Sequence, residues 1–141
     1  MYLDNAATTE LKPEVKDYIV SFLDTYQNPS SMYQSGVNVK QIITTARNNI
    51  AKFINADSKD IIFTSGGSAN NSLFIKGFYQ KYQCMVLYSP TSHKSVLKCV
   101  ESLKYKHPLK VNHNGNINIQ DLKECLSMNL MKKLVVIEYA N

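Results

Sequence analysis

The sequence predicts an α/β fold in which a mostly parallel sheet is covered by helices on both faces. Short β-branched and apolar runs alternate along the chain with longer segments of helical periodicity, and the connections between them are short. The 141 residues are 44% hydrophobic and 19% charged, which is typical of a globular domain large enough to bury a core.

The helices are predicted from apolar residues spaced three and four positions apart. Pro13 marks the start of the first helix, because proline is favoured in the opening turn. The second begins after the break at Asn28-Pro29 and carries the longest apolar stripe. The predicted helices cover residues 11–26, 33–55, 68–82, 93–105 and 119–128.

The strands are predicted from short runs rich in β-branched and aromatic residues. Residues 134–139 form the strongest run and residues 109–111 the weakest. An Asn114-Gly115 turn follows the weak run. The predicted strands cover residues 60–64, 84–88, 109–111 and 134–139.

A candidate anion site lies where the strand predicted over residues 60–64 meets the next helix. The chain reads Ser65-Gly66-Gly67-Ser68 there. Glycines let the backbone come close to a ligand, and a helix N-terminus offers free N–H groups and partial positive charge to a phosphate. A plain turn between strand and helix has the same composition, so the residues alone leave both interpretations open.

His93 is a second candidate, because it lies at a predicted strand-to-helix junction. In an open parallel sheet, the loops after the carboxyl ends of the strands carry the ligand site. A histidine at such a junction can also cap the helix or face solvent. His107 and His113 lie in polar stretches and are expected on the surface.

Composition argues against nucleic-acid and membrane partners. The net charge is +5, but Arg47 is the only arginine among 16 basic residues, and the lysines are scattered. No apolar run reaches the length of about 18 residues that indicates a membrane helix, and the N-terminus lacks a signal-peptide pattern. We therefore expect a soluble, cytoplasmic protein.

The cysteines are expected to be buried thiols. Cys84, Cys99 and Cys125 are odd in number, widely spaced and without a Cys-x-x-Cys pair. This pattern favours neither a disulfide framework nor a zinc site, and we expect no metal.

The end of the chain predicts an incomplete fold. The strongest predicted strand is followed at once by Asn141, so the loop that would carry ligand-binding groups after it is absent. A compact domain of 141 residues is the alternative.

Four motifs support a family resemblance: Leu3-Asp4-Asn5-Ala6-Ala7-Thr8-Thr9, then Asn28-Pro29-Ser30-Ser31 with Gly36, the Ser65-Gly66-Gly67 turn, and His93 after a strand. In this order and spacing they resemble the cysteine desulfurases of the NifS and IscS kind, over the whole chain. Those enzymes are pyridoxal phosphate-dependent members of the class V aminotransferase group, with fold type I. Because they are well over twice as long, the resemblance implies the N-terminal part of their fold.

The resemblance implies a role for each matching residue. Gly67 and Ser68 fall where the family binds the cofactor phosphate, with Ser68 replacing the usual threonine. His93 falls on the histidine that stacks over the pyridine ring and assists proton transfers. Asn141 falls on an asparagine that approaches the phenolic oxygen of the ring. The implied substrate-mouth residues are Asn5, Ala6, Ala7, Thr8, Asn28 and Ser30, the last two near the dimer partner.

The resemblance also implies a domain division, with residues 1–14 as a substrate-mouth segment on the small-domain side and residues 15–141 as the N-terminal half of the cofactor-binding large domain. The sequence departs from the family at three positions. Ala69 replaces a common glutamate, Ser72 a usual asparagine and Tyr33 a frequent histidine. These departures change the hydrogen-bonding groups around the phosphate cradle.

The implied reaction takes sulfur from L-cysteine, leaves L-alanine, and passes the sulfur through an enzyme persulfide to an acceptor protein for iron–sulfur cluster assembly or thio-modification. The family works as a homodimer. Its cofactor-binding lysine, the carboxylate that faces the ring nitrogen and its nucleophilic cysteine all come from beyond the position of Asn141. The chain alone is therefore expected to be inactive, and to self-associate through uncovered apolar faces.

Two alternatives remain open. Another class V enzyme, such as a selenocysteine lyase or an aminotransferase, would share these motifs. A non-catalytic module could keep only the anion site or the dimerisation face.

Overall fold

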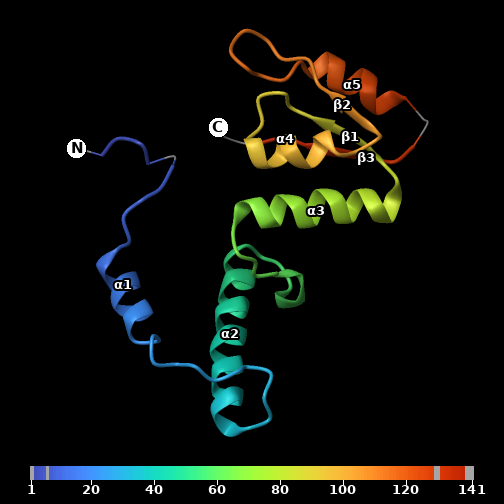
Figure 1. Ribbon diagram of the computed structural model, residues 1–141. Helices are drawn as coiled ribbons and strands as arrows, with labels where there is room; N and C mark the ends of the chain where they lie inside the picture. Colours follow the sequence, from blue (N-terminus) through green and yellow to red (C-terminus); the bar gives the residue numbers. More distant parts are fainter. Residues whose placement is uncertain (1, 6, 129–130, 139–141) are drawn as a thin grey trace. The chain divides into compact units, whose positions relative to one another are not determined.

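The computed structural model describes residues 2–5, 7–128 and 131–138 of the chain. The chain divides into two compact units, unit 1 (Met1–Ile62) and unit 2 (Phe63–Asn141), each of which is described by itself (Figure 1).

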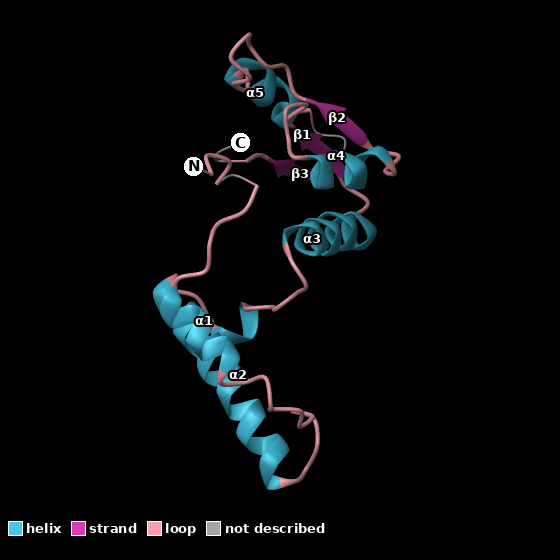
Figure 2. Ribbon diagram, turned by 60° about the vertical axis from the view of Figure 1, so that its left-hand side comes forward, coloured by secondary structure: helices cyan, strands magenta, loops and turns pink. Residues whose placement is uncertain are grey.

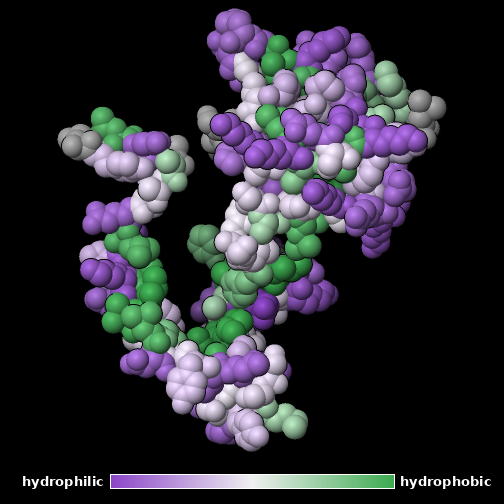
Figure 3. Space-filling model, in the orientation of Figure 1, coloured by the Kyte–Doolittle hydropathy of each residue, from purple (hydrophilic) through white to green (hydrophobic). Residues whose placement is uncertain are grey.

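Unit 1 is helical. It contains α1 (Pro13–Val20), α2 (Gln34–Phe53) and the short 3-10 helix η1 (Ser58–Asp60). Pro13 occupies the first turn of α1, as its missing N–H group favours. The apolar side chains of α1 remain largely uncovered: Val15, Tyr18, Ile19 and Val20 are 45% to 61% exposed. Figure 3 shows this face as green hydrophobic surface.

The start of α2 packs closely against the preceding loop. Gly36 is buried in the first turn of α2. A Cβ atom added at this position would lie 2.1 Å from Ser31 Oγ and 2.5 Å from the carbonyl oxygen of Asn28. Only a residue without a side chain allows this approach, so glycine positions the Asn28–Ser31 loop against the helix.

Unit 2 is an α/β layer structure. Its elements are α3 (Gly67–Tyr82), β1 (Met85–Tyr88), α4 (Lys94–Glu101), β2 (Lys106–Pro108), α5 (Ile119–Ser127) and β3 (Lys133–Val136). The three strands are parallel, in the order β2-β1-β3, with Val86 of β1 opposite Lys106 on one side and Leu134 on the other. The carboxyl ends of all three strands therefore meet at one edge of the sheet.

The helices of unit 2 lie on both faces of this sheet (Figure 2). The crossover from β1 to β2 and the crossover from β2 to β3 run in opposite directions across the sheet. Because parallel crossovers share one hand, their helices α4 and α5 must cover opposite faces. The fold class predicted from the sequence is thus confirmed.

The core of unit 2 is split by the sheet. Side chains alternate between the faces of a strand, so Val86 packs with Ile75 of α3 and Val100 of α4, whereas Leu87 packs with Leu109 and Cys125 on the side of α5. The three cysteines are free and buried, as predicted. Among the described residues, no helix is both long enough and apolar enough to span a membrane.

Two predicted strands are corrected by the structure. Residues 60–64 do not form a strand: Asp60 ends η1, and residues 61–64 have no regular secondary structure. A β-strand is defined by its hydrogen-bonded neighbour, and the β-branched and aromatic composition of this run cannot supply one. The strand predicted at residues 109–111 lies three residues earlier, as β2. Val111 instead forms an isolated antiparallel bridge with Ile117.

Candidate active site

The glycine turn before α3 forms a backbone arrangement that a side chain would disfavour. Gly66 caps the helix with φ +151° and ψ 179°, a conformation that only glycine adopts readily. A Cβ atom built on Gly66 or Gly67 would meet no atom within 4 Å. The glycines therefore leave open space directly in front of the first turn of α3.

The first turn of α3 presents unpaired backbone donors to this space. The first helical hydrogen bond runs from the Asn70 amide to the Gly66 carbonyl oxygen at 3.0 Å. In the described part of the chain, no acceptor takes the amide hydrogens of Gly67, Ser68 or Ala69. The turn carries no acidic residue that would repel an anion. Three free amides, the Ser68 hydroxyl and the helix dipole form a donor set that fits a phosphate group.

The loop before the helix is fixed by Thr64. Its hydroxyl donates to Asn70 Oδ1 at 2.7 Å and accepts from the Gly66 amide at 3.3 Å. These bonds tie the loop to the helix that it precedes, so the open amides are held in place before any ligand arrives.

His93 caps helix α4, which follows β1. Its Nδ1 accepts a hydrogen bond from the Ser95 amide at 3.2 Å, and Ser95 Oγ lies 2.8 Å from the same nitrogen. Because Nδ1 accepts, a neutral imidazole carries its proton on Nε2. The ring is thereby fixed at one edge while the side chain stays exposed.

A hydrogen-bonded chain connects this histidine to the helix with the free amides. Asn71 Nδ2 in α3 donates to Ser95 Oγ in α4 at 2.8 Å, and Ser95 Oγ contacts the imidazole of His93. Asn71 lies one turn beyond Ser68 on the same helix. The structure therefore brings Gly67, Ser68 and His93 into one neighbourhood of unit 2.

The third strand contributes a carboxylate to the same edge. Oε1 of Glu138, two residues after β3, accepts a hydrogen bond from the backbone amide of His93 at 2.8 Å. Beside His93, the buried hydroxyl of Ser92 has no hydrogen-bond partner among the described residues. At the carboxyl edge of the sheet, groups that follow β1 and β3 thus lie near the first turns of α3.

No functional role is predicted from the sequence for Ser95, Asn71 or Glu138. Glu138 lies inside the strand predicted over residues 134–139, and only the observed end of β3 at Val136 places it just past the carboxyl end of a parallel strand. The pairing of Asn71 with Ser95 had no local signal, because these residues are 24 positions apart.

The predicted substrate-mouth residues belong to unit 1. Asn5, Ala7, Thr8, Asn28 and Ser30 are all exposed, and Asn28 Oδ1 accepts from the Ser30 amide at 2.8 Å, which fixes that turn. Ala6 and Asn141 lie outside the described residues. The structure therefore gives no position for the predicted contact of Asn141 with the cofactor ring.

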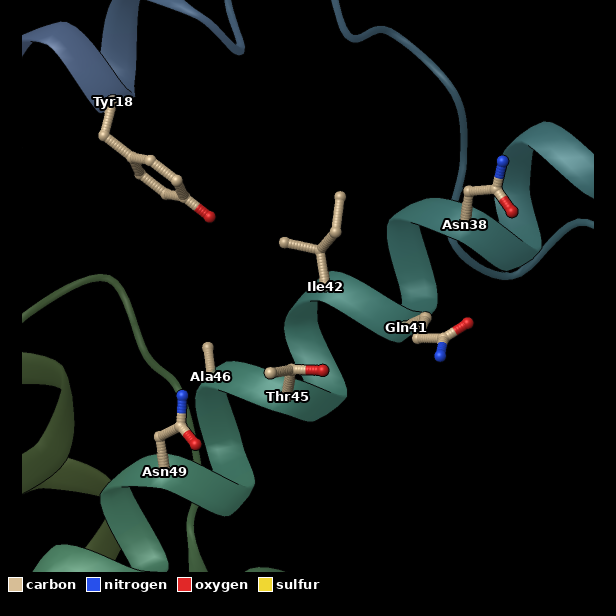
Figure 4. A pocket seen from close by; sticks show the side chains of 7 residues that line it. All are labelled: Tyr18, Asn38, Gln41, Ile42, Thr45, Ala46 and Asn49. Atoms are coloured by element: carbon tan, nitrogen blue, oxygen red, sulfur yellow. The ribbon is translucent and has the colours of Figure 1, made fainter.

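Unit 1 also contains a cavity of about 460 Å³, between Tyr18 of α1 and one face of α2 (Figure 4). Figure 4 shows the Tyr18 ring extending toward Ile42 and Ala46. The rest of the lining consists of amide and hydroxyl side chains, without a histidine, cysteine or carboxylate. The carboxyl edge of the sheet in unit 2 combines a histidine, a carboxylate and free backbone amides, so it is the better candidate for chemistry.

The fold and the edge together define a class of protein: an α/β protein whose parallel sheet presents an anion-binding helix N-terminus beside a histidine. The family described as Aminotransferase class-V matches residues 1–141, and the chain belongs to this family of pyridoxal phosphate-dependent enzymes.

Comparison with individual named proteins gives a more specific similarity. The chain is 37% identical over 155 residues to "Cysteine desulfurase IscS" of Buchnera aphidicola subsp. Baizongia pistaciae, and the match covers 100% of the chain and 37% of that protein. It is 38% identical over 135 residues to "Cysteine desulfurase, mitochondrial" of Candida maltosa, covering 89% of the chain and 28% of the relative. The chain thus spans 37% of the length of the first relative and 28% of the second.

A solved structure shows the same fold. The NifS-like protein from Rickettsia africae is 34% identical and superposes with a TM-score of 0.86, covering 96% of the chain and 38% of that protein. The resemblance to the N-terminal part of the cysteine desulfurases is therefore confirmed.

Proposed function

We propose that this chain supplies the phosphate cradle and the ring-facing histidine of a pyridoxal phosphate-dependent cysteine desulfurase. The complete enzyme would convert L-cysteine to L-alanine and pass the sulfur, as an enzyme persulfide, to an acceptor protein for iron–sulfur cluster assembly or thio-modification. The observation that carries the proposal is the set of free amides at Gly67, Ser68 and Ala69 beside a fixed His93.

The cradle residues act on the cofactor phosphate. The amides and the Ser68 hydroxyl donate hydrogen bonds to its oxygens, and the absence of acidic residues in the first turn of α3 leaves the favourable helix dipole uncompensated. When bound, pyridoxal phosphate supplies an electron-withdrawing ring that accepts negative charge from the substrate.

His93 covers one face of the proposed cofactor site. Its Nδ1 is held by Ser95, so the ring plane is fixed and Nε2 is the nitrogen that can give or take a proton. Glu138 and Asn71 are positioning residues, because Glu138 holds the backbone of His93 and Asn71 holds the hydroxyl of Ser95.

The remaining assignments follow the family. We propose that residues 1–14 form a substrate-mouth segment on the small-domain side and that residues 15–141 belong to the cofactor-binding domain. Asn5, Ala6, Ala7, Thr8, Asn28 and Ser30 would line the mouth, and Asn141 would approach the ring. We further propose a homodimer in the cytoplasm, without nucleic-acid or membrane partners.

We propose that the 141-residue chain alone forms no L-alanine from L-cysteine. None of its lysines matches the cofactor-binding lysine of the family, and Cys84, Cys99 and Cys125 are buried and match no nucleophile. Incubation with L-cysteine and pyridoxal phosphate, followed by assay of L-alanine, tests this statement. Alanine formation that requires the chain would contradict it.

The cradle can be tested without catalysis. Pyridoxine 5′-phosphate carries the ring and the phosphate but has an alcohol in place of the aldehyde, so it forms no covalent adducts with surface lysines. We expect its addition to the ¹⁵N-labelled chain to shift the amide resonances of Gly67, Ser68 and Ala69. Pyridoxine, which lacks the phosphate, is expected to leave them unchanged.

Two variants test the phosphate cradle and the ring-facing histidine separately. Gly66→Ala is expected to abolish the shifts, because it disturbs the turn that presents the amides. His93→Ala is expected to keep the response to inorganic phosphate and to lose the additional response to the ring. If none of the three cradle amides responds to pyridoxine 5′-phosphate, the proposed cradle is wrong.

A further inference from the structure

A group of potential metal ligands lies on the opposite face of the sheet from α4. One ligand atom each from His107, Asp121 and Cys125 lies within 4.8 Å of the other two. Asp121 and Cys125 are four residues apart on α5, so they share one face of that helix. His107 comes from β2, which pairs with β1 on this sheet.

The two helical ligands are buried and well oriented. Asp121 is 7% exposed and Cys125 is 8% exposed, and the thiol of Cys125 forms no disulfide. Oδ2 of Asp121 accepts a hydrogen bond from the Lys110 amide at 2.9 Å. That bond is the main reason why the pKa of Asp121 lies below its ordinary value.

The cation that now faces Asp121 can move away. Nζ of Lys110 lies 3.3 Å from Oδ1 of Asp121, but the lysine side chain is 76% exposed. The ammonium of Lys110 is in contact with water, so it loses little when it leaves the carboxylate. A metal ion could therefore replace the ammonium at Oδ1 while the amide of Lys110 keeps Oδ2 in place, as hydrogen bonds to metal-bound carboxylates commonly do.

A cavity of about 520 Å³ adjoins all three ligands. Leu87 and Met128 belong to its apolar lining, and Glu124 adds a second carboxylate. Two further lysines on the lining are engaged elsewhere. Nζ of Lys106 donates to the Glu101 and Leu103 carbonyl oxygens at 2.6 and 3.0 Å, and Nζ of Lys133 donates to the carbonyl oxygens of Met128 and Met131.

We propose that His107, Asp121 and Cys125 bind a divalent transition-metal ion of the Zn²⁺ type. A thiolate, an imidazole and a carboxylate form the mixed sulfur, nitrogen and oxygen donor set that Zn²⁺ accepts, whereas Mg²⁺ and Ca²⁺ prefer oxygen alone. Binding releases the thiol proton of Cys125 to solvent. With three protein ligands, the fourth coordination position faces the cavity and is open to water or a small ligand.

Cobalt titration of the tag-free chain tests this site. Co²⁺ adopts Zn²⁺ sites and reports a thiolate ligand through an ultraviolet charge-transfer band and tetrahedral geometry through visible absorption. We expect one equivalent of Co²⁺ to produce both signals and one equivalent of Zn²⁺ to remove them. Cys125→Ser is expected to eliminate the charge-transfer band.

The matched control is Cys99→Ser, because Cys99 is also buried but belongs to α4 and the other core cluster. This variant is expected to keep the band. His107→Gln is expected to weaken Co²⁺ binding by more than about tenfold, and its exposed position on an edge strand makes it the variant least disruptive to folding. Binding without a thiolate band, or a band that survives in Cys125→Ser, would overturn the proposal.

Discussion

Oε1 of Glu138 accepts a hydrogen bond from the backbone N–H of His93 at 2.8 Å, so a residue two positions past β3 fixes the residue that precedes α4. The two residues are 45 positions apart in the sequence. Their contact closes the carboxyl edge of the sheet between neighbouring strands β1 and β3, and it sets the backbone position from which the imidazole projects.

Replacing Glu138 tests this contact. Glu138→Leu removes the acceptor at similar size, and we expect it to lower the free energy of unfolding by about 1–2 kcal/mol. Glu138→Gln keeps an acceptor oxygen and is expected to lose less than half as much. Urea denaturation followed by circular dichroism gives both values. An equal loss in the two variants would show that the charge, rather than the hydrogen bond, supports the edge.

Gly66, which caps α3, and Gly77, which lies within it, are expected to respond in opposite ways to replacement by alanine. Gly66→Ala places a side chain at φ +151° and should cost about 1–3 kcal/mol. Gly77→Ala lies inside the helix, where an added Cβ meets nothing within 4 Å, and should stabilise by about 0.5–1 kcal/mol. Thermal unfolding of the two variants checks the sign. A neutral Gly66→Ala would mean that the turn relaxes without strain.

Gly36→Ala is expected to disturb the loop that precedes α2. Its Cβ would meet the Asn28 carbonyl oxygen, which is backbone and cannot rotate away, so we expect a cost of about 1–3 kcal/mol. The neighbouring exposed Ser35→Ala serves as the control and should change stability by less than about 0.5 kcal/mol. Amide hydrogen exchange at Ser30 and Ser31 reports the loop directly. Unchanged exchange in Gly36→Ala would contradict the tight packing.

The buried thiol of Cys84 predicts a loss of stability at alkaline pH. Burial raises the pKa of this thiol, so the unfolded chain loses the proton first. The contribution to stability is therefore full below the unfolded pKa of about 8.5 and declines as the pH rises toward the folded pKa. Cys84→Ala should be less stable by about 1 kcal/mol at neutral pH, because it loses buried volume.

The pH dependence of that difference is the measurement. As the pH rises from neutral to about 9.5, the gap between the parent chain and Cys84→Ala should narrow, since only the parent loses stability through this thiol. Urea denaturation at each pH in the presence of a reducing agent gives the curve. A constant gap would show that the thiol titrates alike in the folded and unfolded chain.

Local sequence patterns located most helices well. The structure has α3 at Gly67–Tyr82 and α5 at Ile119–Ser127, each within one residue of the predicted bounds. Asn118 explains the second case, because its side chain caps the amides of Gln120 and Asp121. The helix predicted over residues 93–105 ends earlier, at Glu101, because the chain must then turn to deliver β2.

Pairing between strands could not be predicted from the same local sequence patterns. Residues 60–64 have strand composition but are not assigned as a strand, whereas β2 forms at exposed residues with little strand character because β1 lies beside it. Hydrogen bonding between strands depends on neighbours brought by the fold, whereas helical bonds lie within four residues along the chain.

The sequence by itself determined the alternation of helices and strands, the glycine turn before α3 and the histidine at the start of α4, because each depends on the conformational preferences of adjacent residues. Only the tertiary structure decided that Asn71 meets Ser95, that Glu138 holds His93, and that His107 joins Asp121 and Cys125. The residues in these contacts come from different helices, strands or loops and lie 14 to 45 positions apart in the sequence. Burial and strand order, rather than local conformational preference, bring them together.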